Sequence, residues 1–212
     1  MKKTIAFASL LALVGSAALA APPASDWTIG PHIRGKNYSV GMPLKPDPIR
    51  SGWAFDFPYH TRAAGHVHYV TFRPDTLAGK SRITVRYRVD AARNTRFVPQ
   101  EAAHLPGTVS LFFQRRGDTW TARGRYNFYR WYAPDHTVQE ISPGVHEMTV
   151  RFDDPLWTPV MGGASGDHQQ SFRAALADPI QIGLVFGSRA GRGHGVFATA
   201  PARFELLSFD VR

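Results

Sequence analysis

Two histidines, His66 and His68, are separated by one residue in the stretch GHVHYVTF at 65–72. Alternate residues of a β-strand point to the same side, so an extended segment would present both imidazoles to one metal ion. A metal-dependent enzyme built on such a pair also needs a third ligand and often a carboxylate, and the next acid in the sequence is Asp75. The alternative is a strand whose histidines only form its polar face. We expect that alternative, and we retain His66 and His68 as candidate metal ligands.

A second stretch, RYNFYRWYAPDH at 125–136, is dense in aromatic residues. Alternation along a strand would place Asn127, Tyr129 and Trp131 on one face and the other aromatic rings on the opposite face. A core needs only one aromatic face, so the second face is available to stack on the C–H groups of a pyranose while polar neighbours bond its hydroxyls. Arg125 and Arg130 would favour an acidic ligand. Burial of both faces is the alternative interpretation.

Other stretches have weaker chemical signals. Asp153 and Asp154 have hard oxygen atoms suited to a structural Ca²⁺, although such pairs often only end a strand. The glycine-rich stretch 186–204 carries Arg189 and Arg192 and joins two predicted strands, so it is either a loop that clamps an acidic group or a long connection. No G-x-S-x-G motif and no suitably spaced carboxylate pair is present, so we predict no catalytic residues.

The N-terminus and the composition indicate an exported protein. The segment MKKTIAFASLLALVGSAALA at 1–20 combines a basic start, an apolar run and small residues at its end, as secretory signal peptides do. The chain of 212 residues has no Cys, so hydrophobic burial must replace disulfides. The net charge of +9 suits an acidic polymer, and we find no nucleic-acid-binding motif. We expect a periplasmic or extracellular protein without a transmembrane segment, and the oligomeric state stays open.

The remaining sequence alternates short β-rich runs with turn residues, which predicts an all-β, antiparallel, jelly-roll-like β-sandwich with one short helix. SRITVRYRVD at 81–90 alternates apolar and polar residues, as does a strand with one solvated face. The helix is expected within 167–179, with Asp167 as its N-cap. We expect a flexible leader at 21–26 and one domain at 27–212.

Two stretches resemble a known family at the level of fold. The closing segment GRGHGVFATAPARFELLSFDV and the middle segment HVHYVTFRPDTLAGKSRITVRYRV are similar to strand patterns of galactose-binding-like jelly rolls, the fold of many carbohydrate-binding modules. The chain is also similar to uncharacterised exported proteobacterial proteins. The resemblance implies glycan binding, often with a structural Ca²⁺.

We therefore predict a secreted, non-catalytic protein that binds carbohydrate or an acidic surface polymer. The candidate ligand-binding residues are Tyr129, Trp131, Asn127, Arg125 and Arg130. One alternative is a metal-dependent enzyme that uses His66 and His68. The other is a structural or interaction protein of the cell envelope.

Overall fold

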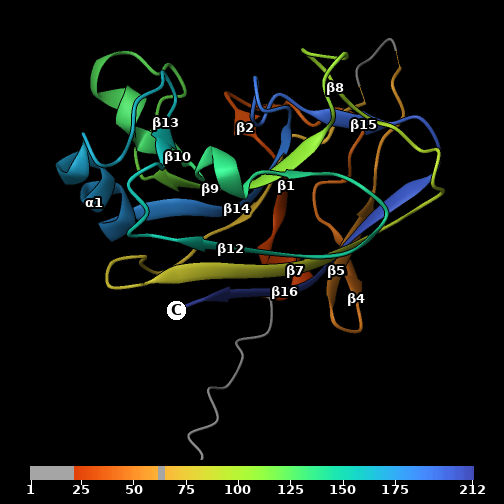
Figure 1. The fold of residues 1–212 in the computed structure, drawn as a ribbon, viewed down its shortest axis with the longest axis horizontal. Coiled ribbons are helices and arrows are strands. Elements are labelled where there is room, and N and C mark those ends of the chain that lie inside the picture. Colours follow the sequence, from red (N-terminus) through yellow and green to blue (C-terminus); the bar gives the residue numbers. More distant parts are fainter. Residues whose placement is uncertain (1–21, 62–64) are drawn as a thin grey trace, which may run out of the picture.

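The computed structural model describes residues 22–61 and 65–212, which form two antiparallel sheets packed face to face (Figure 1). The predicted signal peptide at 1–20 lies outside the described residues. The first sheet has seven strands: six lie side by side in one path, and the seventh, β11, pairs with β9 off that path. In spatial order they are β1 (Thr28–Gly30), β6 (Tyr69–Phe72), β14 (Pro179–Gly187), β9 (Thr108–Arg115), β10 (Arg130–Tyr132) and β13 (Thr158–Pro159), with β11 at Gln139–Glu140.

Five strands make the second sheet, and two short ribbons lie outside both sheets. The sheet runs in the order β12 (Gly144–Arg151), β7 (Arg82–Ala91), β16 (Ala202–Val211), β5 (Gly52–Asp56) and β4 (Asp47–Ile49). The ribbons pair β2 (His32–Ile33) with β3 (Lys36–Asn37), and β8 (Phe97–Pro99) with β15 (Val196–Ala198). Every strand pairing in the described residues is antiparallel, so the expected all-β sandwich is confirmed.

Strand β7 follows directly from its alternating sequence. Ile83, Val85 and Tyr87 are buried, while Arg86 and Arg88 are exposed. The strand pairs with β12 on one side and β16 on the other, so its arginines lie on the solvated face of the second sheet.

An aromatic core joins the two sheets. Phe55 of β5 packs edge-on against Phe186 of β14, and Phe204 of β16 stacks between Phe55 and Tyr87. Four tryptophans are fully buried: Trp27, Trp53, Trp131 and Trp157. Because the chain has no Cys, burial of these rings stabilises the sandwich without any disulfide.

One α-helix, α1 (Gln169–Ala177), covers an end of the first sheet at the left of Figure 1. Phe172 and Ala175 are its buried residues, and Phe172 meets Phe113 of β9. The helix lies within the predicted range, but its N-cap is His168 rather than Asp167, and that cap makes no side-chain hydrogen bond. The helix therefore depends on the packing of its apolar face.

One local expectation is wrong. The stretch 126–132 is not one strand: residues Gly124–Tyr129 form a 3₁₀ segment, η2, and only β10 continues extended. Near the start, η1 (Ala24–Asp26) is a 3₁₀ turn within the stretch predicted as a leader, and its Ala24 is buried. A further 3₁₀ turn, η3, spans Asp135–Thr137.

Candidate functional site

The end of β9 and the 3₁₀ segment η2 together form a surface of tyrosines and arginines. We call it the basic tyrosine surface and define it as Arg115, Arg123, Arg125, Tyr126 and Tyr129. Arg115 is the last residue of β9, and the others lie in or next to η2. The two tyrosines are partly exposed, and Arg123 and Arg125 are exposed.

Each tyrosine of this surface carries a guanidinium group over its ring. Arg115 Cζ lies 4.9 Å from the ring centre of Tyr129, and Arg125 Cζ lies 5.1 Å from that of Tyr126. The two tyrosine rings are 5.1 Å apart and inclined by 57°. A guanidinium stacked on a ring presents N–H donors along its edges, and these donors match the oxygen atoms of carboxylates and sulfates.

The positive charge of this surface comes from arginines without ion pairs. Arg115, Arg123 and Arg125 have no ion pair within the residues that the structure describes. Two acids of the neighbouring segments are already occupied, because Asp118 binds Arg130 and Asp178 binds Arg116.

Two of the five predicted ligand-binding residues are in the interior. Trp131 is 0% exposed, its indole N–H donates to the Phe128 carbonyl over 2.9 Å, and its ring packs against Phe172. It therefore has no free face on which a sugar could stack. Arg130 is also buried, with Nε 2.8 Å from Asp118 Oδ2 and its guanidinium over the ring of Trp120. Asp118 therefore neutralises the charge of Arg130 inside the fold.

The other three predicted residues stay at the surface, in different roles. Tyr129 and Arg125 belong to the basic tyrosine surface. Asn127 is structural: its Oδ1 accepts a hydrogen bond from the Met161 amide over 2.7 Å, which holds the loop that follows β13. The sequence analysis does not select Tyr126, because alternation places it on the core face. It also does not select Arg115 and Arg123, because the turn between β9 and η2 is what brings them close to the tyrosines.

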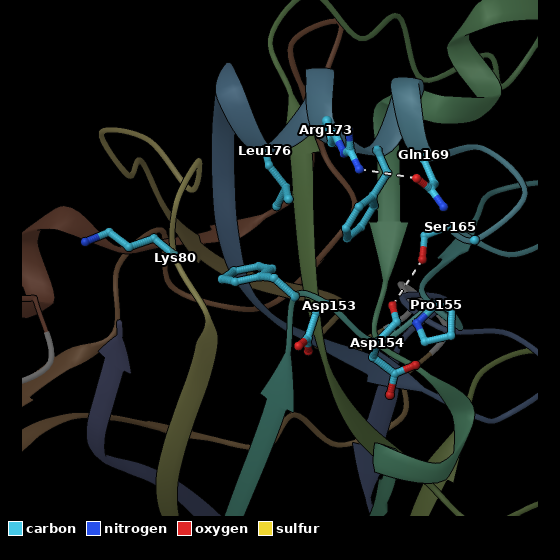
Figure 2. A pocket seen from close by; sticks show the side chains of 11 residues that line it. Lys80, Asp153, Asp154, Pro155, Ser165, Gln169, Arg173 and Leu176 are labelled. Carbon is cyan, nitrogen blue, oxygen red and sulfur yellow. Dashed lines mark hydrogen bonds between the residues drawn. The ribbon is translucent and has the colours of Figure 1, made fainter.

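A hollow of about 360 Å³ lies beneath α1 (Figure 2). We call it the α1 hollow. Phe152, Phe172 and Leu176 give it apolar walls, and Arg173 and Lys80 are the cations at its rim. The helix above the hollow also contacts η2: the ring centre of Phe128 in η2 lies 4.5 Å from that of His168, the N-cap of α1.

The acids beside this hollow are not arranged as a calcium site. Asp153 accepts two hydrogen bonds from Arg151, at 2.8 and 2.6 Å. Asp154 accepts one from the Leu156 amide and lies 3.3 Å from His136 Nε2. These contacts account for both carboxylates as parts of local turns.

The histidine pair lies in a different region. The rings of His66 and His68 are buried, with centres 6.2 Å apart, and His68 Nδ1 lies 3.0 Å from the Gly193 carbonyl oxygen. Burial lowers the pKa of His68 to about 4, so its imidazole is neutral at pH 7. In the described part of the chain, no three His, Asp or Glu side chains come together so as to hold a metal ion. The polar face that these histidines form is therefore buried rather than open to solvent: His66 packs against Phe197 of β15, and His68 contacts the loop before that strand.

The glycine-rich stretch is a connection between β14 and β15, and its arginines are bound within the fold. Arg189 donates to the Asp135 carboxylate and to the Val138 carbonyl, and Arg192 donates to the Ala133 carbonyl. These bonds fasten the loop to η3, so its arginines are not available as a clamp for an acidic group.

Comparisons with known proteins give a likeness in fold only. No family model and no curated protein matches the sequence. Among solved structures, the chain is similar to a carbohydrate-binding module, CBM28, described as specific for non-crystalline cellulose. The two are 10% identical, the match covers 89% of this chain and 87% of that chain, and the TM-score is 0.46.

Within residues 22–61 and 65–212, no helix is long and apolar enough to cross a membrane.

Proposed function

We propose that this chain is an exported, non-catalytic protein that binds an acidic polysaccharide at the basic tyrosine surface. The observation that carries the proposal is the pair of neighbouring tyrosine rings, each with a guanidinium over it that has no ion pair within the described residues. Arginine in this position is pre-oriented, so little side-chain freedom is lost when an oxyanion binds.

The charge of the surface favours an anionic ligand over a neutral one. Three arginines without ion pairs attract a polymer that carries one negative charge per sugar, and the attraction extends over about a Debye length, ~8–10 Å in physiological salt. A repeating polymer can meet all three arginines at once, which a single small anion cannot do. This avidity is why we propose a polysaccharide rather than a free sugar acid.

The tyrosines add contacts that an inorganic anion cannot use. Tyr126 and Tyr129 offer ring edges and hydroxyl groups beside the arginines, where sugar C–H groups and hydroxyls can pack and bond. The predicted signal peptide at 1–20 favours a ligand outside the cytoplasm, which is also where acidic polysaccharides occur.

The test is a titration calorimetry panel at two salt concentrations, about 0.05 M and 0.5 M. The ligands are polygalacturonate, neutral dextran, anionic lipid vesicles and single-stranded DNA. We expect polygalacturonate to bind, to weaken by at least about tenfold at the higher salt, and dextran not to bind. Binding of dextran as tight as that of polygalacturonate would contradict the proposal, and so would a clear preference for vesicles or DNA.

A further inference from the structure

The α1 hollow has the size of a small-molecule site. Its volume of about 360 Å³ lies within the usual range for ligand pockets, roughly 300–1,000 Å³. It opens between α1 and the segment that follows β12, so one wall is helical and the other is the turn containing Pro155 (Figure 2).

The floor of the hollow is apolar and fixed in position. Phe152 and Phe172 are only 5% and 6% exposed, so the packing around them holds both rings. Phe152 stacks on the fully buried Trp157, with ring centres 5.8 Å apart and planes inclined by 13°. A flat apolar group entering the hollow would meet these rings without a change in the core.

The carboxylates near the hollow are not free to receive a ligand. Arg151 binds both oxygens of Asp153, and Asp154 is bonded to the Leu156 amide and to His136. Figure 2 shows the side chains of Asp153 and Asp154 on the side of the hollow away from α1.

The cations at the rim, in contrast, are available. Arg173 and Lys80 have no ion pair within the described residues. Arg173 is exposed on α1 and uses one N–H to bond Gln169 Oε1 over 3.3 Å, which leaves its other donors for a ligand. Lys80 stands at the opposite edge with its side chain directed outward (Figure 2).

We infer that the α1 hollow is a binding site for a small amphiphilic carboxylate. The apolar body of the ligand lies against Phe152, Phe172 and Leu176, and its carboxylate bonds Arg173. This site is separate from the basic tyrosine surface and does not depend on polysaccharide binding there. A ligand of about ten non-hydrogen atoms in a half-open site is expected to bind with a Kd of about 0.1–1 mM.

The test uses phenylacetate and its neutral counterpart phenylacetamide, which have nearly the same shape. The readout is the indole N–H signal of Trp157 in a proton–nitrogen correlation spectrum, assigned with Trp157→Phe, because this ring stacks on the floor of the hollow. We expect phenylacetate to shift the signal and to bind at least about fivefold more tightly than phenylacetamide.

Arg173→Gln is the decisive variant, and Arg50→Gln is its control. Both replaced arginines are exposed and have no ion pair in the described residues, so the change in net charge is matched. We expect Arg173→Gln to remove the preference for phenylacetate and Arg50→Gln to retain it. Equal binding of the two ligands by the unmodified protein would overturn the inference, as would an unmoved Trp157 signal or full preference in Arg173→Gln. None of these results would alter the titration with polygalacturonate, so the two proposals fail separately.

Discussion

The aromatic stretch 125–132 is divided between two environments, and the division falls between Tyr129 and Arg130. Residues up to Tyr129 lie in η2 at the surface, where tyrosine rings support arginines without ion pairs. Residues from Arg130 onward lie in β10, where Trp131 is buried and Arg130 binds Asp118. Neighbouring residues of the same types therefore have different tasks: an arginine whose charge is satisfied internally holds the fold, and one whose charge is unsatisfied is available to a ligand.

Trp131→Ala tests the buried part of this stretch, from Arg130 onward, and has the largest expected effect on stability. Removing the fully buried indole leaves a cavity next to Phe172, and we expect the free energy of unfolding to fall by about 3–5 kcal/mol. Tyr129→Ala, two residues earlier, should lower it by less than about 1 kcal/mol. Urea unfolding followed by circular dichroism measures both. Similar losses for the two variants would remove the distinction between the halves.

Acidification is expected to lower the stability of the fold through the buried His68. The pKa of His68 is about 4 in the folded state against 6.5 for an unperturbed histidine, so between these values the unfolded chain binds more protons. Stability should therefore fall as the pH falls from about 6.5 to about 4, by about 3 kcal/mol in total.

The measurement is urea unfolding at a series of pH values, for the unmodified protein and for His68→Gln. The variant is expected to lose most of the pH dependence in this window. An unchanged slope in His68→Gln would show that other groups cause the acid sensitivity.

Replacing arginines on the binding half should affect the ligand and leave the fold intact. We expect the double variant Arg115→Gln with Arg125→Gln to bind polygalacturonate about tenfold to thirtyfold more weakly, with an unchanged unfolding midpoint. The matched control replaces Arg50 and Arg93, two exposed arginines elsewhere in the chain. An equal loss of affinity in the control would mean that net charge alone, and not this surface, attracts the polymer.

Asn127→Ala has the smallest expected effect. It tests whether Asn127, which lies in η2 but bonds the loop after β13, contributes to the fold or to ligand binding. The variant loses the hydrogen bond to the Met161 amide, so we expect a loss of about 1 kcal/mol in the free energy of unfolding. Polygalacturonate affinity should change by less than about twofold, because Asn127 is assigned to the loop and not to the ligand. Calorimetric melting and titration give the two values, and a large loss of affinity at normal stability would return Asn127 to the binding site.

The regular strands could be predicted because their side chains repeat with the period of the sheet. In β7 every second residue is apolar, and in β14 a nearly continuous apolar run, interrupted by Gln181, is typical of a central strand and lies between β6 and β9. The predicted sandwich and its helix follow from such local patterns together with turn residues.

The expected strand over 126–132 is wrong because the backbone before it adopts conformations that the residue types alone do not indicate. Trp120 and Ala122 have positive φ values of 62° and 56°, followed by Gly124 at 55°. Only the glycine is a residue type that favours this region. The resulting turn starts a 3₁₀ segment, and strand alternation does not determine which rings are buried there. The expectation that Trp131 is exposed and Tyr126 lies in the core is therefore wrong. Arg115 belongs to the basic tyrosine surface because that turn brings η2 back to the end of β9, where the Arg115 guanidinium lies over Tyr129.

The most direct test of the central claim is a footprint of polygalacturonate binding by amide chemical shifts. The account predicts that the largest changes fall on residue 115 and on 123–129, with little change at the solvated face of β7, where Arg86 and Arg88 also lie. Tyr59, a half-exposed tyrosine in a hollow where Arg203 is already paired with Asp56, should also stay unchanged. Changes concentrated at β7 or at Tyr59, with η2 unperturbed, would contradict the assignment of binding to the basic tyrosine surface.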